Sequence, residues 1–95
     1  MQDMTQIRWD SEKERKLRSE TSRNGITFAD CVVAIADERV LDVVPHPSRQ
    51  HQNLAILEIE NYAYVVPFVV EADGTWFLKT VFPSRKFTAL YLGEK

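Results

Sequence analysis

The sequence contains one cysteine, no long apolar run and no excess of positive charge, and each shortage argues against a class of protein. Cys31 alone cannot form an intramolecular disulfide, so we expect a chain suited to a reducing cytoplasm. No segment approaches the ~20 apolar residues that a membrane-spanning helix needs. No signal peptide is expected either, because a strongly charged stretch precedes the first apolar run. The sequence therefore favours a cytoplasmic protein outside membranes.

Charge is distributed unevenly along the chain. The net charge of −2 argues against sequence-blind binding to nucleic acid, which usually requires a strongly basic surface. Residues 1–47 contain 7 Lys and Arg against 9 Asp and Glu, whereas residues 74–93 contain Lys79, Arg85 and Lys86 with no acid. An anionic partner would therefore meet a local basic patch.

The composition indicates one folded domain over residues 1–95. This length supports a single small core, and a hydrophobic fraction of 44% with two Trp, five Phe and three Tyr argues against disorder. No internal repeat or low-complexity segment interrupts the chain. We expect one compact unit.

Two helices are expected in the N-terminal half. The first spans about residues 11–23, where Ser11 and Glu14 have the spacing of a capping box and Gly25 follows as a stop signal. The second begins after Thr27, with Asp30 at the reciprocal capping position. Four of its side chains are expected to share the core face: Phe28, Val32, Ile35 and Ala36. Cys31 lies beside that face, which favours a buried hydrophobe over a catalytic thiol.

An antiparallel sheet of about four strands is expected next. The four strand segments are VLDVV (40–44), LAILEIE (54–60), YAYVVPFVV (62–70) and TWFLKTVF (75–82). The second shows the alternation of a half-buried strand, whereas the third is apolar on both faces and looks central, although Pro67 implies a bulge or an unpaired donor. Asp73-Gly74 marks a hairpin turn into the last strand. There Trp76, Leu78, Thr80 and Phe82 are expected on one face, and Phe77, Lys79 and Val81 on the other.

A third helix is expected at the C-terminus, with Ser84 as its cap. Phe87, Leu90 and Tyr91 form its apolar stripe. The element order is then α-α-β-β-β-β-α, which is an α+β domain.

The segment KTVFPSRKF (79–87) carries the strongest functional signal. Arg85 and Lys86 stand in the first turn of the third helix, where the macrodipole disfavours cations, so local stability does not explain them. With the free backbone N–H groups there, they suggest a phosphate pocket. Lys79 and Arg49 are candidate further donors, and such a cluster can stabilise phosphodiester cleavage without a metal. Alternatively, Lys79 protects an edge strand while Arg85 and Lys86 form surface ion pairs.

Both histidines fall in the polar loop PHPSRQHQN (45–53). A metal site would need further ligands close by, so none is expected, and no cofactor is implied. His46 and His51 remain candidate general bases, as does Glu58, although a solvated loop position is the commoner explanation for a histidine there.

Three short motifs resemble those of BrnT-like toxins from bacterial type II toxin–antitoxin pairs: WDSEK (9–13), NGITF (24–28) and FPSRK (82–86). The resemblance implies a RelE-like ribonuclease that arrests growth and is neutralised by a small DNA-binding antitoxin, often of the ribbon-helix-helix type. Trp9, Asp10 and Lys13 match the family's entry element, and Arg85 matches its arginine after the last strand. Contact with DNA would then be indirect, through the antitoxin.

The leading hypothesis is a metal-independent endoribonuclease in which Arg85 and Lys79 hold the scissile phosphate of RNA that is either free or on the ribosome. Lys86, Arg49, Tyr91 and Lys13 are the further candidate RNA contacts. A second hypothesis is a non-catalytic protein-binding module whose exposed aromatic side chains dock another chain. Trp9, Trp76 and Phe77 are the candidates for such a surface. A degenerate toxin that keeps only the fold is the third.

Overall fold

The computed structural model describes residues 6–19 and 25–93, which form an α+β domain. Its helices are α1 (Ser11–Ser19), α2 (Phe28–Ala36) and a C-terminal helix consisting of α3 (Arg85–Phe87) and the π-helical turn η1 (Thr88–Leu92). Its strands are β1 (Ile7–Trp9), β2 (Val40–Pro45), β3 (Asn53–Ile59), β4 (Tyr62–Val70), β5 (Trp76–Leu78) and β6 (Phe82–Pro83). Within these described ranges, no helix is long and apolar enough to cross a membrane. The expected helix over 11–23 is confirmed as far as residue 19, and its remainder lies outside the described residues.

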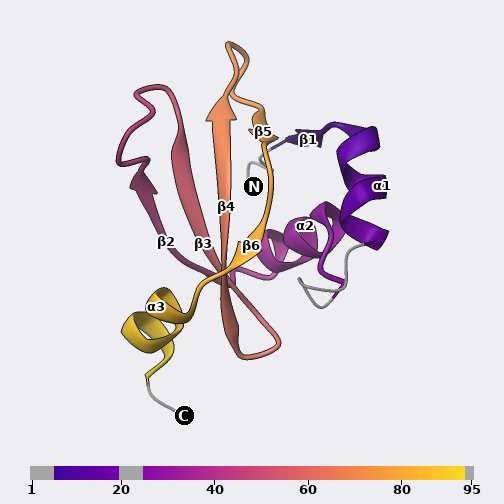
Figure 1. The fold of residues 1–95 in the computed structure, drawn as a ribbon. Helices are drawn as coiled ribbons and strands as arrows, with labels where there is room; N and C mark the ends of the chain where they lie inside the picture. Colours follow the sequence, from indigo (N-terminus) through magenta and orange to yellow (C-terminus); the bar gives the residue numbers. More distant parts are fainter. Residues whose placement is uncertain (1–5, 20–24, 94–95) are drawn as a thin grey trace.

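The six strands form one mixed sheet in the order β1-β5-β4-β3-β2, with β6 also paired to β4 (Figure 1). The pairs β2–β3, β3–β4 and β4–β5 are antiparallel, which confirms the meander. The expected antiparallel sheet of about four strands is correct in part: the sheet also contains β1 and β6, and β1 pairs with β5 in parallel. A strand of three residues is too short to show alternation, and its partner is distant in sequence.

The two faces of the sheet are covered differently. Helices α1 and α2 lie against one face, called here the helix face (Figure 1). The C-terminal helix packs on the opposite face, called here the open face, where Phe87 and Tyr91 contact the cluster of Ile56, Ala63 and Val65. This double cover explains why β4 is buried on both faces, as expected. It also corrects the expectation for β3, whose central residues 55–57 are all buried instead of alternating.

The main core lies on the helix face. Its buried members are Leu17, Ile26, Phe28, Cys31, Ala34, Ala55, Leu57, Tyr64, Val66, Phe68, Leu78 and Val81. Helix α2 contributes Phe28, Cys31 and Ala34, which corrects the predicted core face: Ala36 is exposed and Val32 is only half-buried. Burial raises the pKa of the Cys31 thiol to about 12. Cys31 is therefore a core residue, as expected.

The two N-terminal helices are capped by different devices. The Thr27–Asp30 capping box of α2 is confirmed, with the Thr27 N–H donating to the Asp30 carboxylate at 2.8 Å. For α1 the expected Ser11 cap was wrong by one residue, because Asp10 accepts the Glu12 N–H at 2.9 Å. Glu14, which was expected to cap α1 together with Ser11, is instead buried and accepts the Phe28 N–H at 2.8 Å. One helix thus provides a carboxylate at the N-terminus of the next.

The predicted last strand is interrupted at residues 79–81, between β5 and β6. The Lys79 N–H donates to the Pro67 carbonyl at 2.8 Å, so the side of Pro67 that lacks an N–H faces this gap. The interruption changes which side chains share a face: Val81 is fully buried, whereas Phe82 is 39% exposed. The expected alternation along residues 76–82 was therefore wrong beyond Leu78.

Ser84 caps the C-terminal helix, as expected, by accepting the Phe87 N–H at 3.1 Å. Phe87 and Tyr91 face the sheet, but Leu90 is 64% exposed, so it does not belong to the apolar stripe. The Tyr91 hydroxyl donates to the Asp42 carboxylate of β2 at 2.6 Å. This bond attaches the C-terminal helix to β2, while Tyr91 and Phe87 also pack against the cluster that includes Ile56 of β3.

Candidate functional site

Aromatic and cationic side chains gather on the open face along β5 and β6. Val65 lies in the cluster under the C-terminal helix, and Phe82 is its strand partner, so Phe82 shares this face. Val69 lies on the same face as Val65 because side chains alternate along β4. Val69 pairs with Phe77, and Phe77 pairs with Arg8. The register thus places Arg8, Phe77 and Phe82 together on the open face.

Two cations lie near the ring of Phe77. The Arg8 guanidinium carbon is 5.9 Å from the ring centroid, and the Lys79 Nζ is 5.4 Å from it. Both distances are within the range of a cation–π interaction. Arg8 also forms an ion pair with Glu71 at 3.2 Å. Phe77 therefore orients the ammonium group of Lys79 over the open face.

A shallow groove of about 320 Å³ lies beside Lys79, and we call it the basic groove. Its lining residues are Lys13, His46, Arg49, Gln52, Pro67, Lys79 and Thr80. They come from α1, the β2–β3 loop, β4 and the gap after β5. The structure thus brings together four candidates that are distant in sequence: Lys13, His46, Arg49 and Lys79.

Among the residues that the structure describes, the three cations of the basic groove, Lys13, Arg49 and Lys79, have no carboxylate partner. The ion pairs among residues 6–19 and 25–93 involve Arg8, Arg15, Arg18 and Arg39. No carboxylate of residues 6–19 or 25–93 lines the groove either. Three unneutralised cations in one concavity raise the local potential and attract an anion.

Lys79 lies just beyond the part of β5 that is paired on both sides. β5 lies between β4 and β1, but its pairing with β1 ends at Leu78, and Lys79 is hydrogen bonded to Pro67 of β4. Arg85 and Lys86 make no ion pair within the described part of the chain; Lys86 instead places its Nζ 5.3 Å from the Phe87 ring centroid. Surface ion pairing among the described residues therefore does not account for Arg85 and Lys86.

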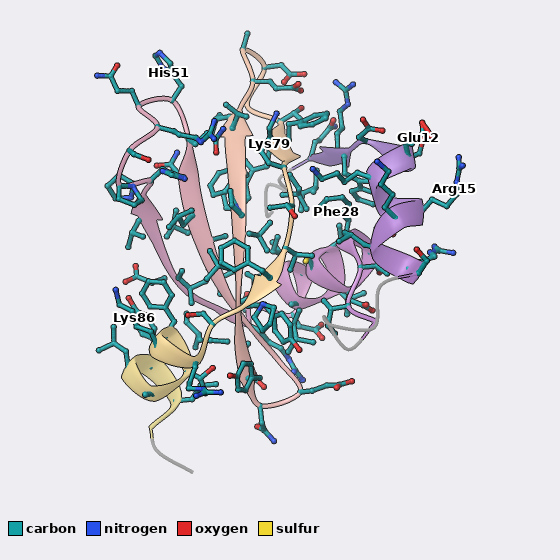
Figure 2. The ribbon with its side chains drawn as sticks, viewed as in Figure 1. Glu12, Arg15, Phe28, His51, Lys79 and Lys86 are labelled. Atoms are coloured by element: carbon teal, nitrogen blue, oxygen red, sulfur yellow. The ribbon has the colours of Figure 1, made fainter. Side chains whose placement is uncertain are left out.

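Arg85 and Lys86 do not line the basic groove. Lys79 is hydrogen bonded to Pro67, and Ser84, just before Arg85, is hydrogen bonded to Ala63, four residues away on β4. At the usual rise of a strand this separation is about 13 Å. Figure 2 shows Lys79 and Lys86 near opposite ends of the sheet. The exposed ring of Phe82 lies in the stretch between them.

The remaining candidates occupy other environments. His51 is exposed at the tip of the β2–β3 loop, outside the groove lining (Figure 2). Glu58 forms an ion pair with Arg39 at 3.6 Å and accepts the Asn61 N–H, so it is engaged elsewhere. Tyr91 uses its hydroxyl to bind Asp42, and this bond, in which the phenol is the donor, raises the Tyr91 pKa. Only His46 of the general base candidates lies in the groove.

The two tryptophans do not form a docking surface. Trp9 stacks on Phe28 at 6.0 Å between ring centroids, and Trp76 stacks on Phe68 at 4.0 Å. Both tryptophans pack against the main core on the helix face. The expectation of an exposed aromatic surface is therefore wrong for Trp9 and Trp76, and Phe77 lies on the opposite face.

Acidic side chains gather in a second groove, of about 210 Å³, beside α2. Its charged lining residues are Asp30, Asp37, Glu58 and Glu60, with Arg39 as the one cation. Acidic and basic residues are thus separated in space, which the net charge of the chain does not show. Among the described residues, no three His, Cys, Asp or Glu side chains are grouped as metal ligands.

The residues that sequence reasoning missed are Arg8, Phe77 as a cation–π partner, and Phe82. The signal for Arg8 is the alternation Ile7-Arg8-Trp9, which becomes readable only once β1 is known to pair with β5. The exposure of Phe82 depends on the interruption at residues 79–81. Neither feature has a local sequence signature.

The fold is similar to that of the Brucella abortus ribonuclease toxin BrnT, whose crystal structure was determined at 1.1 Å resolution. The TM-score is 0.62, and the match covers 85% of this chain and 97% of that chain at 20% sequence identity. No family model and no curated protein matches the sequence. The expectation of a BrnT-like fold is therefore confirmed.

Proposed function

We propose that this chain, which has the fold of a BrnT ribonuclease toxin, is the toxin of a type II toxin–antitoxin pair and arrests growth by cleaving RNA. The observation that carries the proposal is the basic groove, which Lys13, Arg49 and Lys79 line with no carboxylate from the described part of the chain. Three cations in one concavity suit a phosphodiester, and the fold is that of a protein described as a ribonuclease toxin.

In this account, Lys79 and Arg49 hold the scissile phosphate. Their charges lie where negative charge develops during phosphodiester cleavage, which lowers the barrier without a metal or a cofactor. Lys79 is oriented by Phe77 before RNA arrives, so little side-chain entropy is lost on binding. Lys13 adds a third charge from α1.

Arg85 and Lys86 contact the RNA backbone farther along the strand. By the rise of β4, Arg85 and Lys86 lie about 13 Å along the sheet from Lys79 of the basic groove. Tyr91 acts indirectly by fixing the C-terminal helix to Asp42. Phe82, exposed between the two basic regions, offers a surface on which an unpaired base can stack, which favours single-stranded RNA.

The partner in this account is a small DNA-binding antitoxin, with the ribbon-helix-helix type as the specific proposal, and the setting is the bacterial cytoplasm. Any contact with DNA is made by the antitoxin. The RNA is cleaved either free or on the ribosome, and comparing cleavage of naked and translated RNA separates these routes.

The proposal is tested by tightly regulated induction in bacteria of the wild type, Lys79→Ala, Arg85→Ala and the control Lys16→Ala. Lys16 is an exposed cation of α1 outside the basic groove. We expect growth arrest with the wild type and the control. Lys79→Ala should lower RNA cleavage by about 100-fold, as expected when one transition-state donor is removed. Arg85→Ala should relieve growth arrest if the RNA contacts of Arg85 and Lys86 are also needed for toxicity.

Equal soluble expression of the variants must accompany the growth curves. Growth arrest that persists in both Lys79→Ala and Arg85→Ala would show that toxicity does not depend on these two cations. Normal growth with the wild type would contradict an active ribonuclease in that host and favour the degenerate toxin or the binding module. Cleavage of purified RNA then decides between an inactive protein and an insensitive host.

A further inference from the structure

His46 is held by the loop between β2 and β3 in a defined orientation. Its Nδ1 accepts two hydrogen bonds, from the Ser48 N–H at 3.1 Å and from the Arg49 N–H at 3.1 Å. Its own backbone N–H donates to the Gln52 carbonyl at 3.0 Å, which closes the base of the loop. The ring therefore caps the first residues of the loop in the way that an Asn or Asp side chain does.

This geometry fixes the tautomer of the ring. A ring nitrogen that accepts hydrogen bonds carries no proton, and a neutral imidazole then carries its proton on the other nitrogen. His46 is therefore an Nε2–H donor. No described residue accepts a hydrogen bond from that nitrogen, and His46 lines the basic groove.

We infer that His46 is a neutral hydrogen-bond donor to an RNA phosphate in the basic groove, and not its general base. The inference rests on the proposed function and assigns one residue within it. As a base, the ring would have to take a proton at Nε2, which already carries one, or at Nδ1, which faces two N–H groups. No proton is transferred in this role; Nε2–H donates to a non-bridging phosphate oxygen and keeps its proton.

A neutral donor suits the composition of the groove. Lys13, Arg49 and Lys79 already supply three positive charges to the same concavity. A fourth charge would add repulsion in the free protein, whereas an uncharged N–H adds a directional bond to the phosphate without that cost. The Arg49 N–H that holds Nδ1 also links the orientation of the ring to a cationic residue of the groove.

The tautomer is tested directly by long-range ¹H–¹⁵N correlation spectra of the free protein near neutral pH. We expect the ¹⁵N shift of His46 Nδ1 to be that of an unprotonated nitrogen and that of Nε2 to be that of a protonated one. His51, exposed and outside the groove, serves as the internal reference. Protonated Nδ1 in His46, in either the other tautomer or an imidazolium, would overturn the inference whatever the chain does to RNA.

Two substitutions separate the donor from the loop cap. In His46→Asn, the Oδ1 atom can replace Nδ1 as the acceptor of the loop N–H groups, but nothing replaces the Nε2–H. In His46→Gln, the side-chain N–H₂ can reach the Nε2 position, while Ser48 and Arg49, which are exposed, bind water instead. The probe is a fluorescein-labelled 2′-O-methyl RNA oligonucleotide, which cannot be cleaved through its 2′ oxygen.

We expect His46→Asn to weaken binding of this oligonucleotide by about tenfold, as for the loss of one hydrogen bond to a charged group, and His46→Gln to stay within about twofold of the wild type. Equal melting temperatures confirm that both variants fold. Wild-type affinity in His46→Asn, or equal losses in both variants, would overturn the inference alone. Absence of RNA binding by the wild type would instead overturn the proposed function and, with it, this role.

Discussion

The helix face and the open face of the sheet differ in what covers them. On the helix face, α1 and α2 bury a continuous apolar cluster that includes Phe28 and Cys31, both fully inaccessible. On the open face, a short C-terminal helix packs at one end, and Phe82 remains 39% exposed. The first face stabilises the fold, and the second leaves space for a ligand.

Charge is also divided, between two grooves. Within residues 6–19 and 25–93, the cations of the basic groove lie without carboxylate partners, and four acids line the groove beside α2. A chain with a net charge of −2 can therefore present a basic surface to RNA. The lesson is that the sum of charges is a poor guide to binding when the fold separates the two signs.

The largest expected effect comes from truncating a core side chain on the helix face. Phe28→Ala removes a fully buried ring that stacks on Trp9, and we expect the free energy of unfolding to fall by about 3–5 kcal/mol. Urea denaturation followed by circular dichroism measures this loss. A change below about 1 kcal/mol would show that the packing around Phe28 does not stabilise the domain as described.

The same substitution on the open face should act on binding instead. Phe82→Ala removes an exposed ring, so we expect less than about 1 kcal/mol of lost stability. Affinity for the single-stranded RNA probe should fall by about 1–3 kcal/mol if a base stacks on this ring. Fluorescence anisotropy measures the affinity. Unchanged affinity would show that no RNA base stacks on Phe82.

A smaller effect is expected where α1 supports α2. Glu14→Ala removes the buried carboxylate that accepts the Phe28 N–H, and we expect a loss of about 0.5–2 kcal/mol in the free energy of unfolding. Glu14→Gln keeps an acceptor oxygen and should lose less. Equal stabilities of the wild type and both variants, measured in urea, would rule out this cap.

The smallest effect concerns the anchor of the C-terminal helix. Because the hydrogen bond to Asp42 raises the Tyr91 pKa above its usual value near 10, the folded state holds this proton more tightly than the unfolded state. The stabilisation is complete below pH ~10 and is lost as the pH rises through the folded pKa. Tyr91→Phe should therefore lose less stability than the wild type as the pH rises above about 10, the usual tyrosine pKa. Identical pH profiles of the two proteins would contradict the role of this bond.

The features that sequence reasoning recovered are mainly local. The Thr27–Asp30 box, the Asp73-Gly74 turn and the Ser84 cap each depend on residues within one turn, and all three appear in the structure. The three-residue strand β1 was missed because its pairing with β5 is a long-range contact. The capping error at Ser11 came from two neighbouring residues, Asp10 and Ser11, that are both good caps.

Sequence reasoning identified individual residues of the candidate site but did not predict how they are arranged in space. Lys79 and Arg49 were identified from charge and setting, but their convergence with Lys13 depends on how α1 and the β2–β3 loop approach one edge of β4. Arg85 was expected beside Lys79, and the gap in the last strand places it farther along the sheet. Side-chain convergence of this kind has no sequence pattern.

The most direct test of the central claim is to map RNA binding onto the two faces by NMR. The ¹⁵N-labelled protein is titrated with the 2′-O-methyl oligonucleotide, and the chemical shifts of the backbone amides are followed in each helix, strand and connecting loop. We predict the largest changes at residues 46–52 and 77–82, in and beside the basic groove, with little change in α2. Changes concentrated in α2 and at residues 58–60, or none at all, would contradict the assignment of the basic groove to RNA.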